Sequence, residues 1–337
     1  MKKVFALVLA LMLAVASMGI CFAEDGFKAA MVTDVGGVND QGFNQSSWEG
    51  LKKCMDEGWA TAKYLESKQE ADYATNLDIL SEEGNQVIWG IGYLMADALL
   101  TAAQINPENT YAIIDNNYGD ATPANMINVT FKSQDAAFQV GYIAAKMSQT
   151  NSVGMVGGVS GAILDAFDYG YRAGVAYAAK EMGKEIAVTV QYVDSFTDSA
   201  KAKAIAVNMI ENGADVIFAA AGGAGLGAIE AAKELNKYVI GADTDQNYLA
   251  PENLITSCMK GCGAVVYDIC KRLANGEQLG GTSVVGDLST GAVGYTTTGN
   301  LIPENVIADT EAVTAKIIAG EIDVPFDAES FGAWVIE

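Results

Sequence analysis

Residues 29–55 combine three features that constrain the fold of the whole chain. An apolar run, Ala29 to Thr33, has the character of a buried strand and is followed by a polar loop that contains three glycines. Trp48, Leu51 and Met55 then follow at the three-then-four spacing of an amphipathic helix. Strand, glycine loop and helix form the first unit of an α/β sheet. In open sheets of this kind, ligands bind at the carboxyl ends of the strands.

The same alternation continues along the chain, with about ten short apolar strands that are each followed by a helical pattern. Such an order predicts parallel sheets with right-handed crossovers. A chain of 337 residues is long enough for two domains, so we expect two similar halves of five or six strands each. No Pro- or Ser-rich linker divides the halves. We therefore expect the chain to cross between two lobes several times.

Residues 1–23 have the pattern of a signal peptide. Lys2 and Lys3 precede an uncharged apolar run that ends at Ile20, and Cys21-Phe22-Ala23 resembles a cleavage site. We therefore expect export to the periplasm or the cell surface. Cys21 leaves lipid anchoring open as an alternative, although Ile20 stands where a small residue normally precedes a lipidated cysteine.

Composition excludes several classes of function. The net charge is −22, from 42 acidic and 20 basic residues, so binding of nucleic acid or anionic lipid through the general surface is not expected. The chain has no histidine, which removes Ser-His and Cys-His nucleophile pairs and most catalytic zinc or iron sites. We expect neither an enzyme nor a cofactor or metal.

Four cysteines follow the predicted signal peptide, at Cys54, Cys258, Cys262 and Cys270. Their spacing matches no zinc pattern. Buried side chains or one disulfide are therefore expected in preference to a metal site.

Polar and aromatic side chains gather where the predicted strands end. The first loop supplies Asp34, Asn39, Phe43 and Asn44, and later strand ends supply Asp115 and Asp243. Each has a structural alternative: Asp34 could bond loop amides, Phe43 could pack on the first helical turn, and Asn44 could cap the helix.

One long motif carries a family resemblance. The loop Asp34-Val-Gly-Gly-Val-Asn-Asp-Gln-Gly-Phe-Asn-Gln-Ser-Ser-Trp-Glu-Gly resembles the signature of the basic membrane protein family of bacterial ABC-transporter receptors, the purine nucleoside receptor group of type I periplasmic binding proteins. The resemblance extends to Ala214-Asp-Val-Ile-Phe-Ala-Ala-Ala-Gly-Gly-Ala-Gly-Leu-Gly, to Gly241-Ala-Asp-Thr-Asp-Gln and to Lys260. It covers nearly the whole chain after residue 23.

The resemblance implies a two-lobed α/β fold, each lobe a mostly parallel sheet flanked by helices, with the ligand in the cleft between the lobes. The expected ranges are 24–132 plus about 247–290 for the first lobe, and about 133–246 plus about 291–337 for the second. The implied function is an extracytoplasmic receptor that hands a nucleoside to an ABC permease, with a monomer expected.

Carried over by position, the family pattern implies a role for each site residue. Phe43 would stack on the nucleobase, with polar contacts from Asp34, Asn39, Asn44 and Asp115, while Asp243 and Lys260 would hold the ribose. Phe167 and Phe196 are the two places for a second aromatic, and the glycine stretch at Gly222 would let backbone approach the ligand. As structural alternatives, Phe167 also fits the apolar stripe of its helix, and Lys260 could be a solvated lysine.

Two other functions stay open. The fold could serve a receptor for a sugar or another small metabolite. Alternatively, Gly223-Ala-Gly225-Leu-Gly227-Ala228 follows a predicted strand, opens a helix and precedes Asp243 by twenty residues, which are elements of a dinucleotide fingerprint. An NAD-dependent dehydrogenase would be the corresponding enzyme, but the motif lies deep in the chain and no acid–base candidate accompanies it.

Overall fold

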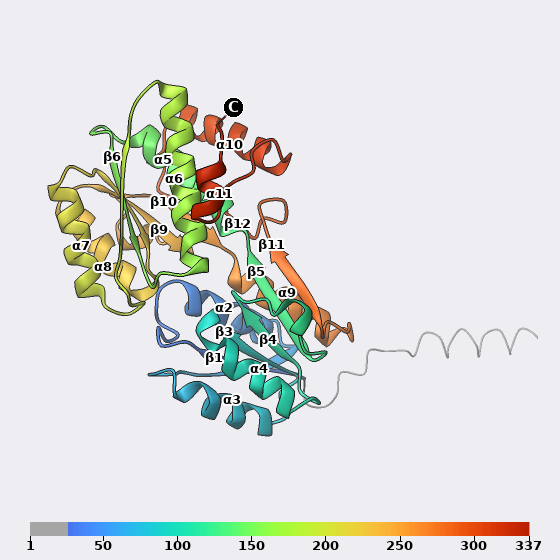
Figure 1. The fold of residues 1–337 in the computed structure, drawn as a ribbon. Helices are drawn as coiled ribbons and strands as arrows, with labels where there is room; N and C mark the ends of the chain where they lie inside the picture. Colours follow the sequence, from blue (N-terminus) through green and yellow to red (C-terminus); the bar gives the residue numbers. More distant parts are fainter. Residues whose placement is uncertain (1–25, 337) are drawn as a thin grey trace, which may run out of the picture.

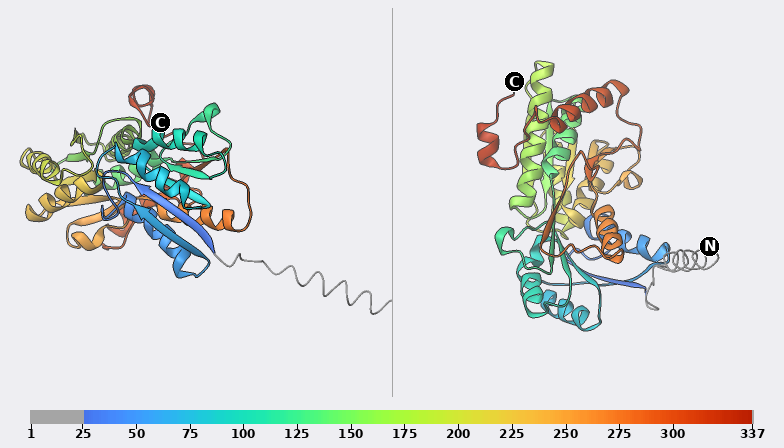
Figure 2. Two further views of the ribbon diagram at one scale, coloured as in Figure 1. Left: turned by 90° about the horizontal axis from the view of Figure 1, so that it is seen from below. Right: turned by 90° about the vertical axis from the view of Figure 1, so that its right-hand side faces the viewer.

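The computed structural model describes residues 26–336, which form two lobes, each built on one six-stranded sheet (Figures 1 and 2). The predicted signal peptide, residues 1–23, and Cys21 lie outside the described residues. The α/β architecture of two mostly parallel, helix-flanked sheets is confirmed.

The first lobe contains a sheet of strand order β11-β5-β4-β3-β1-β2 in which every pairing is parallel. Its strands are β1 (Phe27–Thr33), β2 (Ala60–Leu65), β3 (Val87–Ile91), β4 (Tyr111–Ile114), β5 (Met126–Phe131) and β11 (Thr282–Gly286). Its helices are α2 (Phe43–Asp56), α3 (Asp72–Glu82), α4 (Ala96–Ile105) and α9 (Cys262–Ala274). The central strands β3 and β4 are buried along their whole length, whereas the edge strand β2 is partly exposed. This pattern is expected where helices cover both faces of a parallel sheet.

The second lobe repeats the plan with the order β12-β10-β9-β8-β6-β7, and only β12 is antiparallel to its neighbour. Its strands are β6 (Ser152–Gly157), β7 (Ala187–Tyr192), β8 (Val216–Ala220), β9 (Tyr238–Asp243), β10 (Leu254–Lys260) and β12 (Val293–Tyr295). Its helices are α5 (Ser133–Met147), α6 (Ala162–Met182), α7 (Ser199–Glu211), α8 (Gly225–Glu234), α10 (Glu304–Ile318) and α11 (Ala328–Ala333).

The chain passes between the two sheets three times: between β5 and α5, between β10 and α9, and between β11 and β12. The crossing segments are hydrogen-bonded to one another, because Lys132 N donates to Gly286 O at 2.8 Å and Gly261 N donates to Ala292 O at 2.7 Å. Three adjacent crossings are the geometry of a hinge between lobes.

The range of about 247–290 predicted for the first lobe differs from the structure by one strand. β10 pairs with β9 in the second sheet, and its Ile255 and Cys258 pack in the second-lobe core. The change of lobe comes at Gly261, and α9 lies with the first lobe in Figure 1. Val266 and Ile269 of α9 are buried in the first-lobe core. The strand belongs to the second lobe because it pairs with β9 there, and its apolar side chains pack in that core.

All four described cysteines are buried and free, so the structure contains buried thiols where one disulfide was the other expectation. Cys54 of α2 and Cys270 of α9 lie in the first-lobe core, where these two helices pack together. Within residues 26–336, no group of His, Cys, Asp and Glu side chains could hold a metal ion. Over the same residues, no helix has both the length and the apolar character needed to cross a bilayer.

Candidate functional site

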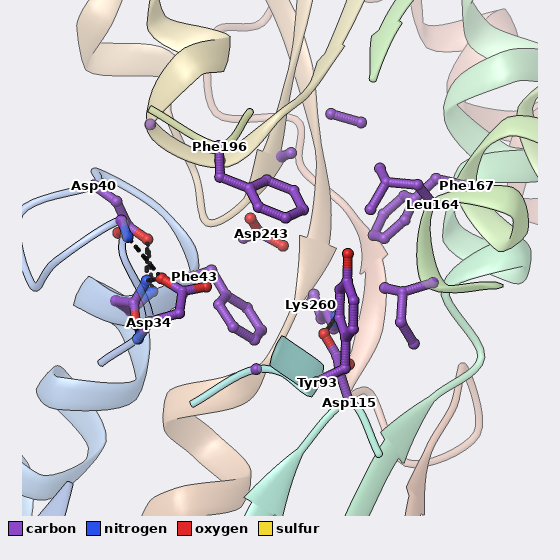
Figure 3. A pocket seen from close by; sticks show the side chains of 18 residues that line it. Asp34, Asp40, Phe43, Tyr93, Asp115, Leu164, Phe167, Phe196, Asp243 and Lys260 are labelled. Atoms are coloured by element: carbon purple, nitrogen blue, oxygen red, sulfur yellow. Dashed lines mark hydrogen bonds and ion pairs between the residues drawn. The ribbon is translucent and has the colours of Figure 1, made fainter. Parts of the chain in front are cut away.

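A cleft lies where the carboxyl ends of the strands of the two sheets meet (Figure 3). It contains about 600 Å³ of space unfilled by atoms, counting the part that opens to solvent. Both lobes contribute side chains to its lining: Asp34, Asp40, Phe43, Asn44, Tyr93 and Asp115 from the first, and Ile163, Leu164, Phe167, Phe196, Asp243 and Lys260 from the second. The backbone approaches the cleft at Gly36, Gly92, Ala220, Gly222, Gly223 and Ala242. A cleft lined by aromatic, apolar and a few charged groups is typical of a small-molecule site.

The loop between β1 and α2 is held in place by Asp40. Its carboxylate accepts hydrogen bonds from the backbone N–H groups of Gly42, Asn44 and Gln45 at 2.8–3.1 Å. These are donors that a helix N-terminus leaves without an intrahelical partner. Asp40 therefore supplies the cap for α2 that the sequence suggested for Asn44.

Asn44 fixes the loop from inside. Its Nδ2 donates to Asp34 Oδ1 at 2.8 Å and to Asp40 Oδ2 at 2.9 Å, while its Oδ1 accepts from the backbone N–H of Asp34 at 3.3 Å. Both amide hydrogens are thus engaged by the protein. Asn44 lines the cleft, but its geometry is that of a residue that positions two carboxylates.

Asp34 offers one free carboxylate oxygen to the cleft. Oδ1 accepts from Gly36 N and from Asn44, both at 2.8 Å, whereas Oδ2 has no hydrogen-bond partner among the described residues. Burial raises the pKa of Asp34 to about 6, against the hydrogen bonds from Asn44 and Gly36, which lower it. Asp34 thus bonds a loop amide, as the structural alternative predicted, and also presents an acceptor to the cleft, where its contact with a ligand stays a prediction.

Asp115 and Lys260 form an ion pair that joins the lobes. Asp115 follows β4 of the first lobe, Lys260 ends β10 of the second, and Lys260 Nζ donates to Asp115 Oδ2. The two side chains are 6% and 2% exposed. Burial by itself lowers the pKa of Lys260, but Asp115 and the other acidic groups nearby outweigh that effect and raise it. The solvated lysine considered from the sequence is therefore not what the structure contains.

Aromatic rings surround this ammonium group. Lys260 Nζ lies 5.0 Å from the ring centroid of Phe43, 5.3 Å from that of Phe131 and 5.7 Å from that of Phe167. These distances allow cation–π attraction. The charge of Lys260 is therefore compensated on several sides.

Asp243 ends β9 and reaches the same cleft with a left-handed backbone, φ 67°. Burial raises the pKa of its carboxyl to about 7, while Lys260 lowers it. A Cβ at Gly42 would lie 3.3 Å from Asp243 Oδ2, so the glycine allows the first-lobe loop to approach this carboxylate closely.

The two candidates for the second aromatic differ in their surroundings. Phe167 is 4% exposed and packs 6.2 Å, centroid to centroid, from Phe218 in the second-lobe core. Phe196 is half-buried, lies against the backbone of Gly158 and Gly222, and is on the side of the cavity opposite Phe43 in Figure 3. Both rings line the cleft, but Phe196 is less buried than Phe167, whose ring packs in the second-lobe core.

The structure brings nine of the ten predicted site residues to one cleft; the exception is Asn39, which is exposed and absent from the lining. Asn39 points outward because the turn it occupies buries its neighbours Val38 and Asp40 instead. Sequence reasoning missed Asp40 and Tyr93. Tyr93 could have been found, since it follows Gly92 at the end of a predicted strand.

Comparison with known proteins places this site in a family. The family model described as ABC transporter substrate-binding protein PnrA-like matches residues 27–328. This chain belongs to that family. The suspected family is therefore confirmed, and with it the function of an ABC-transporter substrate-binding protein at this level.

Several proteins share most of the length of this substrate-binding protein. It is 39% identical over 314 residues to Basic membrane protein A1 of Borrelia garinii subsp. bavariensis, covering 92% of this chain and 91% of that protein. It is 38% identical over 320 residues to the CD4+ T-cell-stimulating antigen of Listeria innocua, covering 89% and 88%.

Solved structures agree on the fold. A solute-binding protein of an ABC transporter system from Aeropyrum pernix K1 superposes with a TM-score of 0.82 at 25% identity, covering 91% of this chain and 96% of that one. An arabinose-binding protein from Geobacillus stearothermophilus, at 15% identity, shares the fold alone, with a TM-score of 0.61 and coverage of 82% and 99%.

Proposed function

We propose that this substrate-binding protein captures a nucleoside, with a purine base preferred, and delivers it to the permease of an ABC importer. The observation that carries the proposal is the pairing of Phe43 with Phe196 across a cleft that also contains carboxylates from both lobes. Stacking of a base on an aromatic side chain contributes roughly 1–3 kcal/mol. Phe196 is proposed as the second stacking residue because Phe167 is committed to the core.

The polar groups divide between base and sugar. Asp34 Oδ2 and the Phe43 ring both lie against Gly92, where a Cβ would be 3.3 Å from each, and this oxygen would accept from the edge of the stacked base. Asp243 stands at the end of β9, where a carboxylate suits the vicinal hydroxyls of a ribose, as in dinucleotide sites. Lys260 would donate to a ribose oxygen with the N–H groups that its bond to Asp115 leaves over.

The proposed mechanism is capture without a chemical step. The lobes close on the ligand by rotation about the three crossing segments, and the permease recognises the closed form. We further propose that the protein acts as an exported monomer, with residues 1–23 as its signal peptide. The alternative is cleavage before Cys21, which would leave that cysteine as the lipid-attachment site. The family match counts against the dehydrogenase alternative, because the matched family is one of substrate-binding proteins. Gly222 and Gly223, at the start of the glycine stretch, line the cleft between the lobes.

Calorimetric titration tests the proposal. The protein from Glu24 onward is unfolded and refolded to remove co-purified ligand, then titrated with adenosine, guanosine, inosine, cytidine, uridine, free ribose and NAD. We expect saturable binding of purine nucleosides and none of ribose, with Phe43→Ala weakening the affinity roughly 5- to 100-fold. Phe326→Ala, at an exposed ring outside the cleft lining, is the control and should leave the affinity unchanged.

Three results would contradict the proposal in different ways. Binding of ribose with tolerance of Phe43→Ala would favour the sugar receptor. Binding of NAD without any nucleoside would revive the dehydrogenase. No response to any compound would leave the family membership standing and remove the nucleoside.

A further inference from the structure

The loop between β1 and α2 touches the second lobe at Gln41. The backbone carbonyl oxygen of Gln41 accepts hydrogen bonds from Gln246 Nε2 at 2.9 Å and from Thr244 Oγ1 at 3.2 Å, and its Oε1 accepts one from the hydroxyl of Tyr248 at 2.5 Å. The three donors follow β9 in the second lobe. None of these four residues belongs to the lining of the cleft. They join the lobes outside the site, and we call them the latch.

The backbone of Gln41 has an uncommon conformation. Its φ of 58° lies in the left-handed region, where glycine, asparagine and aspartate are the usual residues. The loop beside it is fixed, because the Asp40 carboxylate accepts hydrogen bonds from the backbone N–H groups of Gly42 and Asn44 at 3.0 and 2.8 Å. An unfavourable backbone conformation that is held by its surroundings is typical of functional positions. At Gln41 it accompanies the carbonyl oxygen and the side chain that the second lobe binds.

The second-lobe side of the latch is also fixed. Gln246 is 4% exposed, its Oε1 accepts from the backbone N–H of Ala242 at 2.9 Å, and its own backbone N–H donates to Ser257 Oγ at 3.1 Å. A Cβ at Gly241 would lie 2.6 Å from Gln246 Oε1, so glycine makes room for this side chain. The amide is thus held inside the second lobe by its oxygen, while its nitrogen donates to Gln41. Groups that are held in place before they bind lose little conformational freedom on binding.

The contacts of the latch need no ligand. A carbonyl oxygen has two acceptor sites, and the donors from Gln246 and Thr244 fill both at Gln41. The ion pair of Asp115 and Lys260 also joins the lobes, but it lies in the cleft lining, where a ligand can compete for it. The latch lies outside the lining, so a ligand in the cleft does not replace its contacts. It therefore stabilises the closed form with and without a ligand.

We propose that the latch maintains a closed population in the ligand-free protein, with Gln41, Thr244 and Gln246 as positioning residues that set the affinity for a ligand they do not touch. When the closed form is the one that binds tightly, the apparent affinity falls in proportion to the fraction of molecules that are closed. A weaker latch therefore weakens binding while every contact to the ligand is unchanged. The effect on nucleoside affinity rests on the proposed function, whereas the closed population of the free protein does not.

Two variants weaken the latch, and a third is the matched control. Thr244→Val replaces the donating hydroxyl by a methyl group of similar size. Gln246→Glu keeps an oxygen for the N–H of Ala242 but places a carboxylate oxygen, in place of the amide donor, against the carbonyl oxygen of Gln41. Thr101→Val removes a hydroxyl that is bonded within α4 of the first lobe.

Single-molecule energy transfer between the lobes measures the closed fraction. The dyes are attached to cysteines introduced at Lys52 of the first lobe and Lys201 of the second, which are exposed, whereas the four described native thiols are buried. In the ligand-free protein, Thr244→Val should lower the ratio of closed to open molecules roughly 2- to 10-fold, the value of one hydrogen bond. Gln246→Glu should lower it further, and Thr101→Val should leave it unchanged.

Calorimetric titration of the same proteins with inosine measures the affinity. In each latch variant the affinity should fall by the same factor as the closed fraction, and in Thr101→Val it should equal that of the wild type. A merely structural defect would lower the melting temperature, which we expect to stay within a few degrees of the wild type. Thr244→Val, as the conservative change, keeps the test valid if Gln246→Glu does not fold.

Three results would overturn the inference. They are the absence of closed molecules in the ligand-free wild type, an unchanged closed fraction in both latch variants, and an unchanged inosine affinity in a variant whose closed fraction has fallen. Failure of the proposed function is distinguishable, because the wild type would then not bind inosine while energy transfer would still report the closed fraction.

Discussion

Replacing Lys260 by methionine tests the ion pair that joins the lobes. The variant keeps a long apolar side chain but leaves the Asp115 carboxylate, 6% exposed, without its counter-charge. Removing one partner of a buried pair costs roughly 3–5 kcal/mol, because an uncompensated charge stays buried. We therefore expect Lys260→Met to lower the free energy of unfolding of the ligand-free protein by about 3–5 kcal/mol.

The assay is denaturant unfolding followed by circular dichroism, with two companion variants. The double variant Asp115→Leu/Lys260→Met removes both charges, so it should recover most of the loss and yield a large coupling free energy. Lys52→Met breaks a pair whose side chains are 56% and 64% exposed, and its effect on the free energy of unfolding should be small beside that of Lys260→Met. A loss below about 1 kcal/mol for Lys260→Met would refute the reasoning, since it would mean that water reaches Asp115 in the ligand-free protein.

Three further predictions concern titration, packing and closure. Burial raises the pKa of Asp243 to about 7, so the folded state binds the proton of this carboxyl more tightly than the unfolded state. The melting temperature of the ligand-free protein should therefore rise as the pH is lowered from 8 to 5, and Asp243→Asn should flatten that rise. Gly50→Ala places a Cβ 2.3 Å from a backbone carbonyl of α9 and should lower the free energy of unfolding by roughly 1–3 kcal/mol. Gly332→Ala has open space around the new Cβ and should leave the stability unchanged. Equal denaturant midpoints for the two variants would contradict the predicted clash. Tyr248 of the second lobe donates a hydrogen bond to Gln41 Oε1 of the first at 2.5 Å. Tyr248→Phe removes this contact between the lobes and should weaken nucleoside binding roughly 2- to 10-fold by destabilising the closed form. Unchanged calorimetric affinities would count against such a role.

Much of the fold follows from local patterns in the sequence. Parallel strands buried on both faces appear as continuous apolar runs, and helices appear through their apolar spacing, so the alternation was readable as far as α9. The short strands β11 and β12 that follow were not predicted. The lobe to which β10 belongs could not be predicted, because its apolar side chains suit the core of either lobe and only the pairing with β9 decides between them.

The site was predictable to the extent that ligand groups stand at strand ends. Asp34, Asp115 and Asp243 follow or end strands, so the topology alone brings them to one cleft. The roles of Asp40 and Asn44 were not predictable, since hydrogen bonds within a loop depend on its three-dimensional path. The place of Tyr93 after a strand was readable from the sequence, but only the folded chain shows that its buried hydroxyl has no hydrogen-bond partner among the described residues.

The three crossings have a consequence for the order in which the protein can be made. The first sheet takes its last strand, β11, from residues 282–286, and the second takes β12 from residues 293–295. Neither lobe is complete until most of the chain has been synthesised, and no single cut in the gene separates one lobe from the other. A nascent chain that stops after β5 would expose the edge to which β11 pairs, so the two lobes must finish folding almost together.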